Sequence, residues 1–175
     1  MTKRGNDRAD RIALCAKALV DRFGTRDPMR IARGLGIHIL YPEGLVHLKG
    51  FYRVIMRNRF IFLNPSNSLS MNRIVCGHEL GHDMLHREYA EKQVFQEFEL
   101  FSHASRHEQE ANTFLAELLL EDEEVLGYVS EGKTNAEIAV LTDTDPSLVA
   151  LKCDGLIRRG YPLRPQSYDA RFLRR

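Results

Sequence analysis

The sequence predicts an α+β fold in which a small antiparallel sheet lies among helices and a helical extension follows. Three observations predict it. Apolar residues recur at helical spacing in residues 7–23, 69–87 and 105–120, the short apolar runs in residues 37–64 are typical of strands, and residues 134–160 return to helix. The length of 175 residues suits one domain with a small appendage. We predict a main domain over residues 1–130 and a helical extension over residues 131–175.

The elements before residue 69 are two helices and three strands. After the first helix, Asp27 is suited to cap a short second helix that begins at Pro28. Residues 37–41 predict one strand, and residues 49–64 predict two strands that turn around Arg57 and Asn58. One strand of this hairpin, RFIFLN or its partner, is expected to offer an edge to an extended peptide.

Composition excludes several classes of protein. The 25 Lys and Arg residues nearly cancel the 24 Asp and Glu residues, so charge gives no argument for nucleic acid as the main partner. The three cysteines are odd in number and far apart, which predicts no disulfide framework and favours a reducing cytosol. The polar start MTKRGNDRAD predicts no signal peptide, and no apolar run reaches the roughly 18 residues of a membrane span. We therefore expect a cytoplasmic protein.

Residues 74–86, IVCGHELGHDMLH, carry a metal-binding pattern. On a helix, His78 and His82 differ by about 40° in direction, so they project from one face and can share one zinc ion. Glu79 lies about 100° from His78, where a carboxylate can take a proton from an attacking water and pass it to the leaving amine. Gly81 is expected to keep the helix surface low where a substrate backbone approaches.

Two further residues of this segment are interpreted as supporting ones. His86 lies one turn beyond the second histidine, and we favour a helix-surface or hydrogen-bonding role for it over metal ligation. Cys76 is expected to be a small buried residue rather than a ligand.

Catalytic zinc needs a third protein ligand. The extended pattern HExxHxxGxxH is rejected because Leu85 and Glu88 stand where it requires glycine and histidine. The later segment HEQEAN offers Glu108 instead, with Asn112 four residues on and facing the same way, where it can hydrogen-bond a histidine. Glu110 points about 200° away from Glu108 and is the weaker candidate.

The segment between the two predicted site helices stays open. Residues 88–104 are dense in aromatic side chains and fit either a short helix or a flexible flap. Four residues are candidates to donate a hydrogen bond to a developing oxyanion, and none is preferred: Tyr52, Tyr89, His103 and His107.

The charged residues of the second half are segregated. Residues 108–131 hold eight acidic residues and no Lys or Arg, whereas residues 151–175 hold seven basic residues against two acidic ones. We favour two solvated faces, with folding of the basic stretch onto the acidic one as the alternative.

Residues 134–160 predict two helices around a turn, similar to a helix-turn-helix unit. Asp143 stands where that turn often has glycine, and Lys152 stands where an apolar residue is expected. The second helix is mostly apolar, whereas a helix that reads DNA should expose polar side chains. We therefore favour packing, or docking of a repressor, over DNA binding.

Taken together, these segments resemble the ImmA/IrrE metallopeptidases, a branch of the gluzincin-type zincins. The resemblance rests on FGTRDPMRIARGLGIHILY, LKGFYRVIMRNRFIFLN, HELGHDMLH, EQEANTFLAELLL and LIRRGYPL, which span roughly residues 20–163. It implies a zincin-like fold and a cytoplasmic zinc endopeptidase of a type often carried by prophages or mobile elements. Its implied substrate is a helix-turn-helix repressor encoded nearby. The metal would be held by His78, His82 and Glu108, with Glu79 as general base.

Two departures from the family pattern and one rival hypothesis remain. No proline follows the AELLL segment, and Asn112 replaces an aspartate that some members have, so no charge there raises the basicity of a histidine. The rival is a zinc-binding regulatory protein without peptidase activity that acts through protein or DNA contacts. Purely structural zinc is the weakest reading, because structural sites usually have four protein ligands, often cysteines.

Overall fold

The computed structural model describes residues 3–45, 48–92 and 106–163. Within these ranges the protein has seven helices and a three-stranded sheet, which confirms the predicted α+β class. In chain order the elements are α1 (Lys3–Phe23), α2 (Pro28–Gly34), β1 (His38–Leu40), β2 (Gly50–Ile55), β3 (Asn58–Leu63), α3 (Leu69–Lys92), α4 (Arg106–Leu119), α5 (Asp122–Ser130), α6 (Asn135–Leu141) and α7 (Pro146–Arg158). Of residues 88–104, left open between helix and flap, residues 88–92 continue α3 and residues 93–104 lie outside the described residues.

The sheet has the order β1-β3-β2. The β2–β3 hairpin is antiparallel, as predicted, but β1 joins β3 in parallel, so the sheet is mixed and the prediction of a wholly antiparallel sheet is wrong. The hairpin turns at Met56 and Arg57, one residue earlier than predicted, and both residues have the left-handed backbone that a tight two-residue turn requires. Because β3 pairs on both sides, the segment RFIFLN does not offer a free edge. Among the described residues, its partner β2 pairs on one side only, so the expected edge falls to β2.

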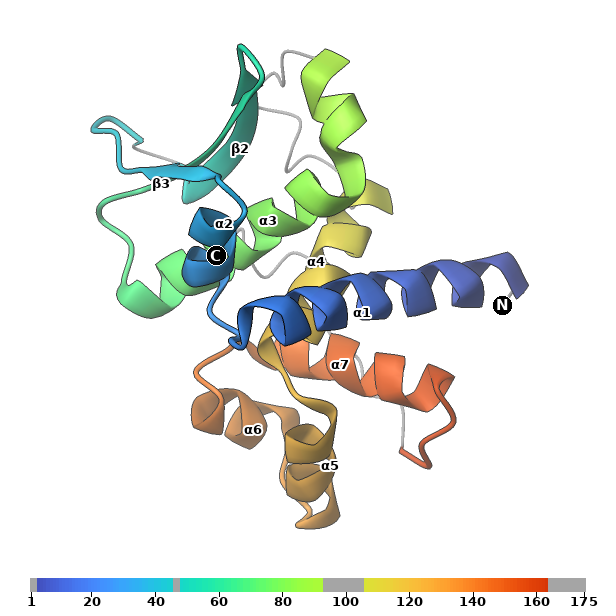
Figure 1. Cartoon of the computed structure of the whole chain (residues 1–175). Helices are drawn as coiled ribbons and strands as arrows, with labels where there is room; N and C mark the ends of the chain where they lie inside the picture. Colours follow the sequence, from blue (N-terminus) through green and yellow to red (C-terminus); the bar gives the residue numbers. More distant parts are fainter. Residues whose placement is uncertain (1–2, 46–47, 93–105, 164–175) are drawn as a thin grey trace.

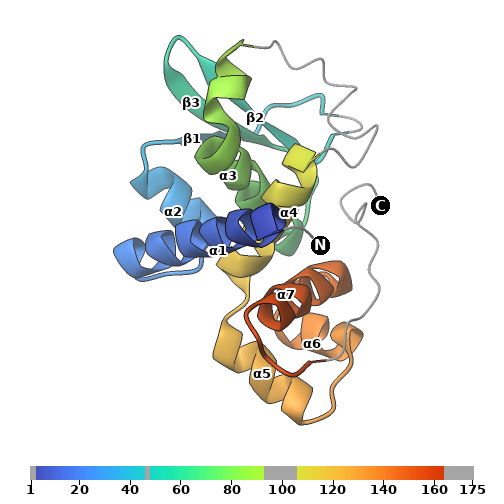
Figure 2. The ribbon, with the colours of Figure 1, turned by 90° about the vertical axis from the view of Figure 1, so that its right-hand side faces the viewer.

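Sheet and extension lie at opposite ends of the molecule, with α1, α3 and α4 between them (Figures 1 and 2). One apolar cluster joins the sheet to α1, α2 and α3, and it includes Phe114 and Leu118 of α4. A second cluster joins Leu115 and Leu119 of α4 to α5, α6 and α7. Helix α4 therefore belongs to both cores. The predicted division after residue 130 stays a prediction, and Val125 of α5, before that boundary, packs in the second cluster.

Helix starts in the described chain follow local signals. The side chain of Asp27 accepts a hydrogen bond from the Met29 N–H at 2.9 Å, and Pro28 begins α2, as the sequence predicts. Thr134 caps α6 in the same way and forms a reciprocal capping box with Glu137. No described helix is long and apolar enough to cross a membrane.

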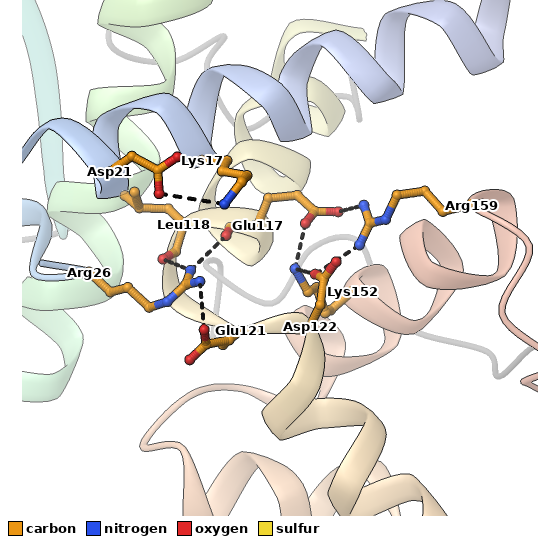
Figure 3. A network of polar contacts seen from close by, with 9 residues as sticks. All are labelled: Lys17, Asp21, Arg26, Glu117, Leu118, Glu121, Asp122, Lys152 and Arg159. Atoms are coloured by element: carbon orange, nitrogen blue, oxygen red, sulfur yellow. Dashed lines mark hydrogen bonds and ion pairs between the residues drawn. The ribbon is translucent and has the colours of Figure 1, made fainter. Parts of the chain in front are cut away.

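Lys152 of α7 and Arg159, which follows it, pair with Glu117 of α4 and Asp122 of α5. For these residues the prediction of two solvated faces is wrong, and the alternative of basic residues folded onto the acidic stretch holds; the basic residues from 164 onward lie outside the described residues. Lys152 donates to Glu117 at 2.5 Å and lies 2.5 Å from Asp122, and Arg159 contacts the same two carboxylates at 2.9 Å (Figure 3). Lys152 is almost fully buried, with 2% of its side chain exposed. A buried ammonium needs a carboxylate partner, and that partner lies 35 residues away in the chain.

The helix-turn-helix resemblance of α6 and α7 extends to the backbone. Asp143 has φ of +50°, so it adopts the left-handed conformation for which glycine is usual at this turn. Helix α7 is nevertheless mostly buried, including Leu148, Val149 and Leu156. A helix packed in this way does not present a polar face to a DNA groove, which agrees with the packing role favoured from the sequence.

Candidate metal centre

Two helices supply the candidate metal ligands. His78 and His82 project from one face of α3, and their Nε2 atoms lie 3.1 Å apart. Glu108, in the first turn of α4, brings one carboxylate oxygen to 3.1 Å from Nε2 of His78 and the other to 3.3 Å from Nε2 of His82. Both imidazoles are nearly fully buried. The structure thus brings together three side chains that the sequence separates by up to 30 residues.

Close packing of α3 against α4 makes this meeting possible. A Cβ atom at Gly81 would lie 3.1 Å from the ring of Phe114 and 3.2 Å from Cα of Ala111, both in α4. The missing side chain of Gly81 therefore faces the neighbouring helix. This corrects the expectation that Gly81 leaves room for a substrate backbone.

The three side chains fit a divalent metal ion. One nitrogen or oxygen atom from each of them can be chosen so that all three lie within 4.8 Å of one another. Two nitrogens bound tetrahedrally to zinc at about 2.0 Å are about 3.3 Å apart, close to the Nε2 separation found here. Two histidines with one carboxylate are also the donor set of catalytic zinc sites that keep a position open.

Electrostatics in the cluster follow from burial and from the carboxylate. Burial lowers the pKa of both imidazoles. For His82 burial prevails, whereas for His78 the Glu108 carboxylate outweighs burial, so that the pKa is raised. Burial raises the pKa of Glu108, but hydrogen bonds with the two histidines outweigh it, and the net shift is downward. Glu108 is therefore an anion held by hydrogen bonds from the two imidazoles.

Glu79 is buried beside this cluster. Burial raises its pKa to about 7; the nearby His78 opposes the shift, Glu108 adds to it, and a hydrogen bond from the backbone N–H of Tyr52 opposes it. Tyr52 belongs to β2, so the free-edged strand lies next to this carboxylate. A carboxylate with a pKa near neutrality can both accept and return a proton.

Asn112 lies behind His78, as the sequence predicts. Its side-chain oxygen is 2.9 Å from Nδ1 of His78. An amide oxygen only accepts hydrogen bonds, so Nδ1 carries the proton and Nε2 keeps its lone pair for a metal.

His86 and Glu110 lie next to the three candidate ligands but are not among the group that could hold the metal. Nδ1 of His86 is 3.2 Å from Nδ1 of His82, and Nε2 of His86 is 3.0 Å from Glu110. Helix α3 kinks at His86, where φ is −133° and ψ is 17°. Burial lowers the pKa of His86 to about 4, with Glu110 opposing the shift, so the ring is neutral at physiological pH.

Asp83 is a residue that the sequence interpretation missed. Its fully buried carboxylate accepts hydrogen bonds from the Tyr52 hydroxyl at 2.6 Å, from Arg59 at 2.9 Å and from Arg87 at 2.8 Å. These contacts fix β2 and β3 over the site helix. A sequence signal for this role was that Asp83 is an acidic residue on the side of α3 that helical periodicity predicts to be buried.

The oxyanion candidates are now distinguishable in part. The hydroxyl of Tyr52 is engaged by Asp83, and the ring of His107 stacks edge-on against His86 at 4.6 Å between centroids. His103 and the side chain of Tyr89 lie outside the described residues. Cys76 is fully buried, as expected.

Comparison with known proteins identifies related sequences. The model of the Peptidase M78 family, described as the IrrE N-terminal-like domain, matches residues 32–149. A curated relative, named uncharacterized immunity region protein 2 of Bacillus phage phi105, is 35% identical over 142 residues, which cover 81% of this chain and 88% of the relative. No solved structure matches the chain significantly.

Proposed function

This chain belongs to the Peptidase M78 family of IrrE N-terminal-like domains, and from that premise we propose that it is a zinc-dependent endopeptidase. The observation that carries the proposal is the convergence of His78, His82 and Glu108, with Glu79 buried beside them. We propose His78, His82 and Glu108 as the ligands of the metal and Asn112 as the residue that orients His78. Zinc held there would polarise the scissile carbonyl and acidify water.

The role of Glu79 is that of general base and then general acid. Its carboxylate takes a proton from water as the water oxygen bonds to the carbonyl carbon of the scissile peptide. It then returns that proton to the amide nitrogen as the C–N bond breaks, leaving a carboxylic acid and an amine. In the metal-free protein, burial raises the pKa of Glu79 above that of an ordinary glutamate, which helps the carboxylate to take up and hold the proton that it later returns.

The proposed substrate is a regulatory protein of a prophage or mobile element, a helix-turn-helix repressor encoded near this gene. The name of the relative, which refers to a phage immunity region, supports this choice. The side of β2 that pairs with no other described strand suits an extended substrate segment, because an unpaired strand edge offers backbone N–H and C=O groups. A role in the cytoplasm follows from that substrate.

Cleavage by a base-deficient variant tests the proposal. The purified protein is mixed with the repressor encoded beside its gene, and the products are read by mass. Wild type should cleave, a chelator should stop it, and Glu79→Gln should keep zinc but lose cleavage. Glu123→Gln, at an exposed position of α5, is the matched control and should cleave normally.

Two outcomes would decide against the peptidase. Unimpaired cleavage by Glu79→Gln would contradict the mechanism. No cleavage by wild type, together with equal action of wild type and Glu79→Gln at the target promoter, would favour the regulatory protein without peptidase activity. The burial of α7 already speaks against DNA contacts as the route for such a regulator.

A further inference from the structure

A chain of polar contacts runs from His82 to the first helix of the protein. It passes from Nδ1 of His82 to His86 at 3.2 Å and from His86 to Glu110 at 3.0 Å. Glu110 then contacts Arg106 at 2.7 Å and Arg8 of α1 at 2.5 Å. Arg8 lies 102 residues from Glu110 in the sequence, so this contact between distant parts of the chain connects α1 to the candidate metal centre.

The proton positions along this chain follow from the chemistry of imidazole. If Nε2 of His82 donates its lone pair to a metal, Nδ1 of the same ring must carry the proton. In the part of the chain that the structure describes, the partner of that N–H is Nδ1 of His86, which must therefore be an acceptor. The one proton of the neutral His86 ring then sits on Nε2, where the acceptor Glu110 lies. Each contact thus has one donor and one acceptor.

The two candidate ligand histidines are supported differently. His78 donates to Asn112, a neutral amide. His82 donates through His86 to Glu110, a carboxylate that is only 9% exposed. A carboxylate behind a ligand histidine raises the basicity of the ring more than an amide does. The charge that is missing behind His78 is therefore present behind His82, one ring further away.

We propose that His86 and Glu110 are positioning residues of the metal centre, which hold the His82 ring in its ligating tautomer and orientation, and that Arg8 of α1 holds Glu110 in place. The inference rests on the proposed metal site. It extends that site from three ligands on two helices to a relay that includes α1.

The geometry distinguishes this role from simple packing. The Glu110 carboxylate accepts hydrogen bonds from Arg8 and Arg106 as well as from His86. The two arginines balance its negative charge, so His86 does not have to transfer its proton to Glu110. Helix α3 kinks at His86, where the ring contacts both His82 and Glu110. A ring that served only to fill space would need neither contact.

Zinc affinity tests the proposal, measured by competition with a chromophoric chelator. His86→Phe keeps an aromatic ring but removes both hydrogen bonds, and it should weaken zinc binding about 10–100-fold. Glu110→Gln keeps an acceptor but removes the charge, and its loss should be smaller, about 10-fold. The matched control is Glu117→Gln, because Glu117 is also buried on α4 between two cations but contacts no histidine, and its zinc affinity should be unchanged.

A second readout separates positioning from stability. Long-range ¹H–¹⁵N spectra of the zinc-loaded protein report which ring nitrogen carries each proton. His86 should carry its proton on Nε2 and His82 on Nδ1. A His86 proton on Nδ1, or wild-type zinc affinity in both His86→Phe and Glu110→Gln, would overturn the relay while leaving the metal site intact. Absence of zinc binding by wild type would instead contradict the proposed function itself.

Discussion

The two halves of α4 use carboxylates in opposite ways. In the N-terminal half, the two carboxylate oxygens of Glu108 lie 3.1 and 3.3 Å from the Nε2 atoms of two imidazoles. In the C-terminal half, Glu117 lies between Lys152 and Arg159 (Figure 3). An imidazole can lose its proton and bind a metal ion together with the carboxylate. Lys and Arg instead supply the positive charge themselves and do not bind a metal ion. The first arrangement is therefore suited to bind a metal ion, and the second is already neutralised and fixes α7.

The comparison shows why buried charge alone does not identify a functional site. Both carboxylates are mostly shielded from solvent, with 15% of the Glu108 side chain and 6% of the Glu117 side chain exposed, and both lie in the same acidic stretch. What differs is whether the partner side chains can also bind a metal ion: the histidines beside Glu108 can, whereas the Lys and Arg beside Glu117 cannot. The predictions below test this difference, from the largest expected effect to the smallest.

Removal of Glu108 should have the largest effect on metal binding. Glu108→Ala removes one of three proposed ligands. Loss of a residue that only supports a ligand lowers metal affinity by up to about 100-fold, so zinc affinity should fall by more than that here. Glu117→Ala should leave zinc affinity as in wild type. Isothermal titration of both variants measures this, and a comparable loss in the two would contradict the division of α4.

Removal of Glu117 should have the largest effect on stability. Glu117→Ala leaves the buried Lys152 with Asp122 as its remaining acidic partner, so unfolding free energy should fall by about 3 kcal/mol. The double variant Glu117→Leu with Lys152→Met removes both charges, and it should recover much of that loss. Denaturant unfolding of the metal-free proteins measures both values. A double variant less stable than Glu117→Ala would refute the pairing account.

A methyl group at Gly155 should disturb the same contact. A Cβ atom there would lie 2.6 Å from Oε1 of Glu117, so Gly155→Ala should lower the unfolding free energy by about 1–3 kcal/mol. In a Glu117→Ala background the clash is gone, and Gly155→Ala should add little further loss. Additive losses in a thermal or chemical unfolding series would show that Gly155 acts elsewhere.

Acid should weaken the metal-free protein partly through Glu110. Burial raises the pKa of Glu110, but Arg8, His86 and Arg106 outweigh it and hold the pKa at about 2, against 4.5 for an ordinary glutamate. A lowered folded-state pKa stabilises the protein above pH 4.5, and this stability is lost as the pH falls from 4.5 to 2. Glu110→Gln should therefore flatten the dependence of unfolding free energy on pH in that window. An unchanged slope would contradict the ion-paired state.

Local patterns in the sequence predicted much of the fold and the candidate site. A spacing of four predicts that His78 and His82 share a helix face, and the Glu108–Asn112 spacing predicts that both face the same site. Caps such as Asp27 and Thr134 also depend only on neighbours, and the structure has both.

Contacts between distant elements could not be predicted in the same way. The sequence pattern favours a solvated position for Lys152, whereas the structure buries it against Glu117 of another helix. Helical periodicity does not show which helices pack together, so this contact could not be predicted. The direction of Gly81 toward α4 and the burial of Asp83 under β2 depend on the same tertiary arrangement. The tie from Arg8 to Glu110 spans 102 residues and carries no local signal at all.

Zinc K-edge X-ray absorption of the zinc-loaded protein tests the central claim most directly. We predict a first shell of nitrogen and oxygen atoms without sulfur, with the outer-shell scattering of two imidazoles, and a Glu108→Ala spectrum that lacks the carboxylate contribution. Glu117→Ala should give the wild-type spectrum. A shell with three imidazoles, or a wild-type spectrum from Glu108→Ala, would contradict the assignment of His78, His82 and Glu108 as the metal ligands.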